Sequence, residues 1–427
     1  MRAAMEQLIG ARQAKTVFYF LALISGVLYA FSVFFDVFIY RVFFHPFLPS
    51  IYASVTFALS EQWLALLFTV ILLLILSIPT NRARRRSVGT IIDRSFAHIT
   101  FPSRKIIRDI ILAGLFSGIA TFAYYYVAGQ SSDVSAVIPF SRLSLIYLMI
   151  GDLILIRDWP SSIEALSILA ITFGVILVGI TPVGIFNPYL LLFVITVWAG
   201  GIAFSIFFQS RAKRAEIRPN TTTDSLNLRL WILLFLNTIM TVFMIPFITP
   251  DVITLLIVLL PLIWGWLLLP VSLTFFSLVA YLQALGRGKM SVVQSIGSIA
   301  IILGIPLTMV GAFLLPGIFN PPATDFLSWM LKLTGTIFVV AGIIALSSAT
   351  LRGYVFVKLR PGTGDIMDAL RHIHGVRRVS AVSGPWDYLI RIEIRTLSST
   401  RVKTLRKIEE VKGVADMETS LILKEWE

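Results

Sequence analysis

The chain has 427 residues, of which 57% are apolar, 12% aromatic and only 14% charged. Soluble globular domains carry about 25% charged residues, so this composition excludes an ordinary soluble protein. The absence of cysteine excludes disulfides and cysteine-ligated metal, and the net charge of +13 suggests a nucleic-acid partner only if the basic residues have no other reason to cluster.

The charged residues are segregated and leave long apolar runs, each close to the ~20 residues that cross a bilayer as a helix. Backbone amides inside lipid need partners within their own segment, so these runs are predicted to be helices. The apolar stretch Asp251–Trp264 is predicted to be a short interfacial helix before the eighth span. The ten predicted spans are Val17–Tyr40, Ile51–Pro79, Ile107–Ala128, Val134–Ile156, Ile163–Thr181, Pro188–Gln209, Leu226–Ile248, Gly265–Leu285, Ser291–Leu315 and Trp329–Ser348.

The N-terminal segment Met1–Thr16 carries Arg2, Arg12 and Lys15 ahead of the first apolar run. That run is too long for a cleavable signal peptide, and no small-residue cleavage site ends it. The segment is therefore predicted to lie in the cytoplasm, with the first span acting as a signal anchor.

Basic residues gather in the loops that an inside N-terminus places in the cytoplasm, as the positive-inside rule requires. The turn Gly129–Asp133 on the opposite side has no cation. This distribution predicts cytoplasmic N- and C-termini in the plasma membrane, and it explains the net charge without nucleic acid. The basic residues assigned to the cytoplasm are Arg82, Arg84, Arg85, Arg86, Arg94, Arg104, Lys105, Arg211, Lys213, Arg214, Arg218, Arg287 and Lys289.

Three sequence echoes indicate that the membrane region is built from two related halves, residues 17–181 and 182–348. Each half has five predicted helices, and because five is odd the second half must be inverted relative to the first. The paired stretches are Ala30–Asp36 with Ala203–Gln209, Ala123–Ser135 with Ala280–Ser291, and Ser167–Ile176 with Gly335–Ile344.

The composition changes after Ser348, where charges become dense and apolar runs short. Alternating apolar residues predict strands, and apolar residues three or four apart predict amphipathic helices. The order βαββαβ predicts a ferredoxin-like α+β domain over residues 353–427, on the cytoplasmic side. Its predicted elements are the strands Tyr354–Arg360, Val376–Val382, Trp386–Ile394 and Val414–Leu423, and the helices Gly362–Ile373 and Ser398–Val411.

The membrane region contains Trp198-Ala-Gly-Gly, the two Ala-Tyr stretches that lead to Ser135 and Ser291, Gly174-Val and Gly342-Ile. In these motifs the region, over about Val17–Ser348, resembles the EamA-type drug/metabolite transporters. The resemblance implies ten helices in two inverted repeats and the transport of small metabolites. The sequence departs from the family at Tyr29-Ala30, where a Trp-Gly pair is common, and at Ile156–Trp159, where Gly-Glu-Arg is usual.

The tail contains the stretches Tyr354–Lys358, His374–Val376, Val382–Leu389 and Gly413–Ser420. In these stretches it resembles the ligand-binding (RAM) domain of Lrp/AsnC-type regulators. The resemblance implies that the domain dimerises through its sheet and binds an amino-acid effector near a Gly-x-x-Asp loop, here Gly384 and Asp387, with Thr419 and Ser420 across a dimer contact. A solvated turn is the alternative role for Asp387. A transmembrane helix replaces the DNA-binding helix-turn-helix that usually precedes this domain, so no nucleic acid is expected.

Arg142 lies about eight residues into the fourth predicted span, roughly 12 Å deep at 1.5 Å per residue. A cation at that depth is unfavourable unless it is paired or faces water, so it usually marks a pathway or a buried ion pair. Its planar donors fit a carboxylate, which predicts contact with substrate. An ion pair with Asp36 and snorkelling to the surface are the alternatives. Its counterpart in the second half is Ser298.

Asp36 lies near the outer end of the first span, where it could bind substrate, carry a proton, pair with Arg142 or end the helix in water. Other polar or amphipathic side chains in the apolar helices are candidates for lining a cavity, although helix-packing hydrogen bonds would also explain them. The predicted substrate-binding residues are Arg142, Asp36, Tyr125, Trp198, Gln283, Gln294 and Ser298.

Nothing in the sequence resembles an enzyme active site, and neither cofactor nor metal is expected. The combined prediction is a permease that moves a small metabolite, an amino acid or other carboxylate, by alternating access. An amino-acid effector would regulate it through the cytosolic domain, which would also join chains into a homodimer or higher oligomer. The alternatives are a membrane-anchored amino-acid receptor without transport, and a constitutive exporter that uses the tail only to oligomerise.

Overall fold

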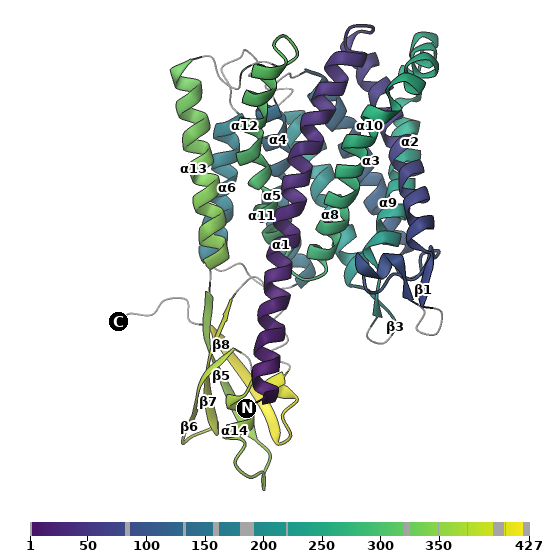
Figure 1. Cartoon of the computed structure of the whole chain (residues 1–427). Coiled ribbons are helices and arrows are strands. Elements are labelled where there is room, and N and C mark those ends of the chain that lie inside the picture. The colour runs from purple at the N-terminus through teal and green to yellow at the C-terminus, as the bar shows by residue number, and fades with distance from the viewer. Residues whose placement is uncertain are drawn as a thin grey trace.

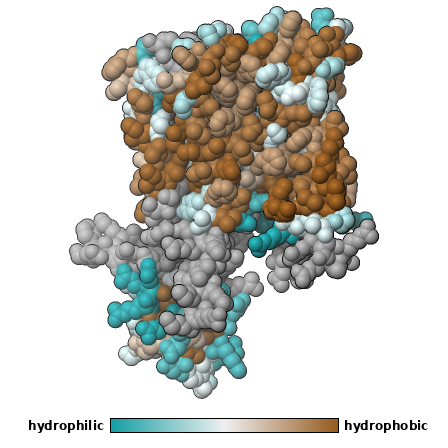
Figure 2. Space-filling view, viewed as in Figure 1, coloured by the Kyte–Doolittle hydropathy of each residue, from teal (hydrophilic) through white to brown (hydrophobic). Residues whose placement is uncertain are grey.

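The computed structural model describes residues 2–81, 86–130, 134–156, 162–179, 192–218, 221–319, 321, 325–348, 350–373, 375–395, 405 and 407–421. Long helices form a bundle, and a small β-sheet domain follows the last helix on one side of it, here called the domain side (Figure 1). Within these residues, nine helices are long and apolar enough to cross a membrane. Figure 2 shows apolar surface over most of the face of the bundle that is in view. Large apolar side chains such as Leu67, Leu262 and Phe313 are exposed. These features indicate a multi-pass membrane protein.

The helices of the bundle largely follow the predicted spans. α1 begins earlier than predicted, because it is helical through the N-terminal segment as well. The π-helical turn η1 (Tyr40–Phe44) continues α1, and η3 (Val194–Ala199) precedes α8. The long helices are α1 (Arg2–Ile39), α2 (Ser50–Leu76), α3 (Ile107–Gln130), α6 (Ser162–Gly179), α8 (Gly200–Arg214), α9 (Ser225–Met244), α10 (Pro250–Leu285) and α13 (Phe326–Ser348). The short connecting elements are β1 (Pro79–Asn81), β2 (Arg86–Ser87), η2 (Val88–Ile91), β3 (Glu216–Arg218), β4 (Thr221–Thr222) and η4 (Ile245–Phe247).

The predicted interfacial helix at Asp251–Trp264 is wrong, because α10 runs unbroken from Pro250 to Leu285. Pro261 and Pro270 lie inside it, and each removes one backbone hydrogen bond without ending the helix. Apolar residues flank both prolines, and in lipid the backbone there has no alternative partner to its own helix. At 1.5 Å per residue, these 36 residues extend about 54 Å, which exceeds the ~30 Å hydrocarbon core.

The predicted fourth and ninth spans are each divided into two helices near their middle. At both breaks the backbone tightens from i−4 to i−3 hydrogen bonding. The Leu143 N–H donates to the Phe140 carbonyl at 3.3 Å, and the Ser298 N–H donates to the Ser295 carbonyl at 3.0 Å. The fourth span is not among the nine membrane-capable helices. The divided helices are α4 (Val134–Arg142) with α5 (Ser144–Ile156), and α11 (Met290–Gly297) with α12 (Ile299–Leu314).

α6 and α13 pack backbone to backbone through small residues. A Cβ atom on Gly174 would lie 2.5 Å from the Gly335 carbonyl oxygen, and one on Gly335 would lie 2.6 Å from the Gly174 carbonyl oxygen. A Cβ atom on Gly342 would lie 2.8 Å from the Ser167 carbonyl oxygen. Real Cβ atoms essentially never approach a heavy atom within 3.0 Å, so this close crossing requires glycine at these positions.

The domain after α13 contains a four-stranded antiparallel sheet in the order β6-β7-β5-β8. The first and third strands of the domain are central, which is the strand order of the predicted ferredoxin-like fold. The predicted second helix, Ser398–Val411, lies largely outside the described residues, and its described part around Ile408 is helical. Val355, Val357 and Ile390 pack with Ile408 in the core of this domain. Its elements are β5 (Thr350–Leu359), α14 (Met367–Arg371), β6 (Val376–Ala381), β7 (Tyr388–Arg395) and β8 (Val414–Leu421).

Candidate functional site

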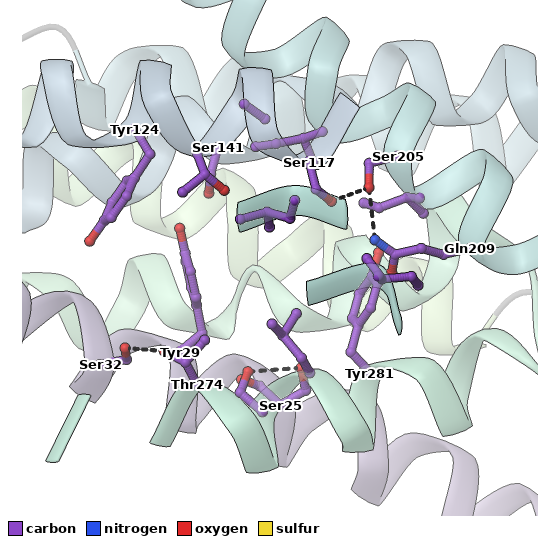
Figure 3. Close-up of a pocket in the computed structure, with 18 of the residues that line it drawn as sticks. Ser25, Tyr29, Ser32, Ser117, Tyr124, Ser141, Ser205, Gln209, Thr274 and Tyr281 are labelled. Carbon is purple, nitrogen blue, oxygen red and sulfur yellow. Dashed lines mark hydrogen bonds between the residues drawn. The ribbon is translucent and has the colours of Figure 1, made fainter. Parts of the chain in front are cut away.

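A cavity of about 220 Å³ lies inside the helical bundle (Figure 3). On α1 its lining side chains are Ser25, Tyr29, Ser32 and Asp36, spaced so that one face of the helix points inwards. Helices α3, α8 and α10 each contribute a similar stripe, and α2, α4, α9, α11 and the π-helical turn η3 complete the wall. The other polar and aromatic lining residues are Glu61, Gln62, Ser117, Thr121, Tyr124, Tyr125, Ser141, Arg142, Trp198, Ser205, Gln209, Arg229, Thr274, Ser277, Tyr281 and Gln294.

Two buried carboxylates line the cavity, each held by a tyrosine of α3. The Tyr124 hydroxyl donates to Asp36 Oδ2 at 2.6 Å, and the Tyr125 hydroxyl donates to Glu61 Oε2 at 2.8 Å. Gln62 Nε2 in turn donates to the Tyr125 hydroxyl at 2.8 Å. The two tyrosine rings have centroids 5.1 Å apart, so adjacent residues hold both acids in one part of the cavity. Neither carboxylate forms an ion pair with any residue that the structure describes.

Two buried arginines also line the cavity. Arg142, the last residue of α4, has its guanidinium carbon 5.1 Å from the centroid of the Tyr29 ring. A Cβ atom on Gly297, the last residue of α11, would lie 3.3 Å from Arg142 Nη1, so the guanidinium lies where the two divided helices meet. Arg229 lies one turn into α9. Within the described residues, the Nε atoms of both arginines are buried without a hydrogen-bond partner.

Hydroxyl groups join the lining helices in three pairs, one of which is Ser25 Oγ on α1 with Ser277 Oγ on α10 at 3.4 Å. Ser32 Oγ on α1 lies 2.6 Å from Thr274 Oγ1 on α10, and Ser117 Oγ on α3 lies 2.5 Å from Ser205 Oγ on α8 (Figure 3). Gln209 Nε2 donates to the same Ser205 oxygen at 2.8 Å. These contacts fix the lining helices in position and also offer polar groups to an occupant of the cavity.

Buried polar contacts hold α11 against α5 and α6. Asp152 on α5 accepts hydrogen bonds from the Met290 and Ser291 N–H groups at 2.9 and 2.8 Å, which satisfies the first amides of α11. Lys289, next to them, forms an ion pair of 3.1 Å with Glu164 on α6. The start of α11 is therefore fastened to both neighbouring helices.

Asp93 lies in the segment between α2 and α3, outside the membrane helices. It accepts a hydrogen bond from the Ser225 N–H at 2.7 Å, and one carboxylate oxygen lies 3.4 Å from Lys213 Nζ. Burial by itself raises the pKa of Asp93, but the Lys213 ammonium and hydrogen bonds from Ser95 and Ser225 outweigh burial and lower the pKa to about 2. Asp93 is therefore an ionised structural contact on the domain side.

The cavity brings together five of the seven predicted substrate-binding residues. Gln283 is not among them, because its Nε2 donates to the Ile92 carbonyl at 2.8 Å and joins α10 to the α2–α3 connection. Ser298 lies at the break between α11 and α12, where its hydroxyl donates to the Gln294 carbonyl at 3.1 Å. Neither of these two residues is among those that line the cavity. The predicted residues that line the cavity are Arg142, Asp36, Tyr125, Trp198 and Gln294.

The structure shows neither of the two alternative roles of Arg142, an ion pair with Asp36 and snorkelling to the surface. No ion pair joins it to Asp36 in the part of the chain that the structure describes. Its side chain does not snorkel either, since the residue is only 5% exposed.

Sequence reasoning missed Glu61 and Arg229, although both lie inside predicted spans. The signal that selected Arg142, a charged residue within an apolar run, applies to both of them. Their contribution to one cavity could not be recognised without the packing of α2 and α9 against α3.

The predicted effector residues lie in two separate parts of the C-terminal sheet. Gly384, with φ of +138°, shapes the turn between β6 and β7, and Asp387 Oδ2 accepts a hydrogen bond from the Leu359 N–H at 2.6 Å. In β8, Thr419 and Ser420 pair in register with Val355 and Tyr354 of β5. β7 and β8 lie on opposite sides of β5, so two strand spacings of about 4.8 Å each separate the two groups within a single chain.

Comparison with known proteins identifies the C-terminal domain. Residues 352–427 match the family model described as "Lrp/AsnC ligand binding domain". No curated protein matches the chain. A solved structure titled only "Crystal structure of protein" is similar over 76% of this chain and 95% of its own, with 13% identity and a TM-score of 0.44, too low to support an argument about the fold. The chain is thus a multi-helical membrane region followed by an Lrp/AsnC ligand-binding domain.

Proposed function

We propose that the chain is a plasma-membrane permease for a small carboxylated metabolite, regulated by an amino acid bound to its C-terminal domain. The observation that carries the proposal is Arg142. Its guanidinium is buried at the junction of two divided helices and faces a cavity, and its Nε has no hydrogen-bond partner among the described residues. A buried cation without an opposite charge is strongly unfavourable, and a bound carboxylate would supply one.

Alternating access between two inverted repeats of five helices, as in EamA-type transporters, is the proposed mechanism. Reciprocal contacts between the halves support it. Ser32 and Ser205 occupy the same place in the first sequence echo, and each bonds to the opposite half, Ser32 to Thr274 and Ser205 to Ser117. Ser117 and Thr274 also correspond, since each precedes the tyrosine of the second echo by seven positions.

The third echo gives the same reciprocity. It aligns Ser167 with Gly335 and Gly174 with Gly342. In the structure Gly174 contacts Gly335, and Gly342 contacts Ser167. Exchange of the two halves turns each contact into the other, which is the pattern expected of a pseudo-twofold axis between α6 and α13.

The divided helices supply the candidate gates. Asp152 binds the first amides of α11, and at the corresponding place Thr308 Oγ1 of α12 accepts a hydrogen bond from the Ser135 N–H of α4 at 3.1 Å. Asp152 follows Ser135 by 17 positions, and Thr308 follows Ser291 by the same 17. Rocking of one half against the other would break one of these contacts while keeping the other, and so open the cavity to one side at a time.

The Lrp/AsnC ligand-binding domain supports regulation by an amino acid. Its first strand, β5, starts at Thr350, two residues after α13 ends at Ser348. Because α13 packs on α6 across the halves, an effector that reorients the domain would act on a helix at their interface.

Flux into sealed proteoliposomes tests the proposal. Purified chain should accumulate or exchange a labelled carboxylated metabolite from a panel of amino and organic acids, and Arg142→Ala should abolish the flux. Binding without flux across the whole panel would favour the membrane-anchored receptor. Flux that no amino acid at the C-terminal domain alters would favour the constitutive exporter.

A further inference from the structure

Four charged side chains of both signs line the cavity without pairing with one another. Asp36, Glu61, Arg142 and Arg229 are 4%, 3%, 5% and 6% exposed, respectively. In the described part of the chain, the ion pairs involve other residues, such as Lys289 with Glu164 and Lys213 with Asp93. The fold therefore forms buried ion pairs elsewhere and keeps the opposite charges of the cavity apart.

This separation limits what can occupy the cavity. A buried charge is unfavourable unless an opposite charge or hydrogen bonds compensate it. An anion would compensate the two arginines but leave both carboxylates without an opposite charge. A cation would compensate the two carboxylates but leave both arginines without one. An occupant that carries a positive group at one end and a negative group at the other compensates both. The volume of about 220 Å³ is below the ~300–1,000 Å³ of sites for drug-sized ligands, so the occupant is small.

The acidic part of the cavity has the acceptors that an ammonium group requires. Asp36 and Glu61 each use one oxygen for a tyrosine hydroxyl, and Asp36 Oδ1 is buried without a partner in the described structure. An ammonium has three N–H donors and no acceptor. It can donate to the second oxygen of each carboxylate.

The basic part has the donors that a carboxylate requires. Arg142 has its guanidinium against the Tyr29 ring, which holds the plane of the fork in one orientation. Tyr29 and Asp36 lie on the same cavity-facing side of α1, two turns apart. Two turns of helix rise about 11 Å, and a contact of about 4 Å at each end leaves about 3 Å between an ammonium and a carboxylate, as in an α-amino acid.

We propose that the substrate is a small zwitterion, with its ammonium between Asp36 and Glu61 and its carboxylate on Arg142. This inference rests on the proposed transport function, because only a transported molecule is a substrate. Its separate claim is that binding requires both the ammonium and the carboxylate of the ligand. Glu61 thereby becomes a residue that determines specificity.

Three probes of one carbon skeleton test this claim on the full-length wild-type chain. They are leucine, 4-methylpentanoate, which lacks the ammonium, and 3-methylbutylamine, which lacks the carboxylate. Alanine, phenylalanine and their deaminated counterparts extend the series to other sizes. Binding to the detergent-solubilised chain is measured by thermal shift and isothermal titration. At least one amino acid should bind roughly 30-fold or more tightly than both of its single-charge analogues.

The variants Glu61→Gln and Asp36→Asn keep the shape of each side chain and remove the charge. Each variant should weaken the binding of amino acids, while the deaminated acid should bind as before or better. The ratio of the affinities for the amino acid and its deaminated counterpart should therefore decrease. Asp109→Asn is the matched control: Asp109 is buried and pairs with Arg211 at 3.2 Å, but it does not line the cavity. It should leave the preference unchanged.

Equal binding of amino acids and their deaminated counterparts would overturn the inference. The inference would also be overturned if Glu61→Gln and Asp36→Asn stopped flux but kept the binding preference for amino acids over their deaminated counterparts. The two carboxylates would then transfer a proton and would not bind the substrate. The proposed function fails separately. Selective binding of zwitterions that Glu61→Gln removes, without flux, contradicts the permease and leaves the inference intact, because binding at the C-terminal domain would survive that variant. Flux of organic acids without amino-acid selectivity does the reverse.

Discussion

At the scale of single residues, the surroundings of Arg142 determine what its replacement will do. Its guanidinium contacts an aromatic ring and a helix break, and no described carboxylate lies within ion-pair distance. Lysine can keep the positive charge at this position, but it has no planar fork and loses the stacking on Tyr29.

Arg142→Lys should therefore weaken binding and flux of carboxylated substrates by roughly tenfold or more while the protein stays folded. The measurements are flux in proteoliposomes and the melting temperature of the purified variant. A variant that transports normally would contradict the assignment of Arg142 to the substrate.

A double-mutant cycle with Asp36 provides a second test of the role of Arg142. Because no ion pair joins Asp36 to Arg142, the stability changes of Arg142→Ala and Asp36→Ala should be additive within about 0.5 kcal/mol in a double-mutant cycle. Strong coupling in stability, with flux retained in the double variant, would mean that the two residues form a structural pair.

Asp93 should make stability depend on acidic pH. Its folded-state pKa of about 2 lies below the ordinary value of 3.8, so the ionised form is stabilised by folding. This contribution, about 2 kcal/mol, is complete above the unfolded pKa and is lost as the pH falls from about 4 towards 2. Asp93→Asn should therefore lower the melting temperature at pH 7, and the gap to the wild type should narrow below pH 4. A gap that is constant with pH would show that the charge of Asp93 does not contribute.

At the scale of elements, glycine decides how closely α6 and α13 approach. The Thr172 and Thr336 hydroxyls beside Gly174 and Gly335 donate to carbonyls of their own helices, so the contact depends on backbone packing. The contact is reciprocal, so a methyl group added to either glycine would clash with the backbone of the other half.

Gly174→Ala should destabilise the protein by roughly 1–3 kcal/mol, because the new Cβ atom would lie 2.5 Å from the Gly335 carbonyl oxygen. Gly265→Ala in α10 is the control. Nothing lies within 4 Å of its Cβ position, so alanine there should be neutral or stabilising by helix propensity. Melting temperatures of both variants in detergent provide the comparison. Equal effects would exclude a special role for the glycine contact.

At the scale of the whole molecule, the C-terminal domain has surface left to cover. Tyr354 and Phe356 lie on the sheet face opposite the core, where Phe356 and Trp386 have ring centroids 6.1 Å apart. The outer strands β6 and β8 also present unpaired edges. These features fit the dimerisation that the Lrp/AsnC resemblance implies.

Residues 351–427 expressed alone should fold and self-associate, and an amino acid should shift the association. Sedimentation with and without a panel of amino acids measures both effects. Phe356→Lys should weaken the association and leave the fold intact, because Phe356 is on the outer face. A monomer that responds to no amino acid would remove the regulatory role of the domain.

The sequence by itself determined the class of the protein and the kind of domain at its end. Long uncharged runs require helices in lipid whatever their packing, and alternation with turn residues is a local property of strands, so both were predictable. The C-terminal resemblance also held, because its motifs are contiguous in the chain. Arg142 was recognisable for a similar reason, since a charge in an apolar run is visible one residue at a time.

Only the tertiary structure decided which polar residues share a cavity. Gln283 and Gln294 look alike in sequence, yet one bonds to a loop carbonyl and the other lines the cavity, because the direction of a side chain depends on how its helix is rotated against its neighbours. Glu61 and Arg229 join Asp36 and Arg142 for the same reason. The unbroken course of α10 through two prolines was also undecidable locally, since a proline ends a helix only where the freed carbonyl has a better partner than its own helix, and lipid provides none.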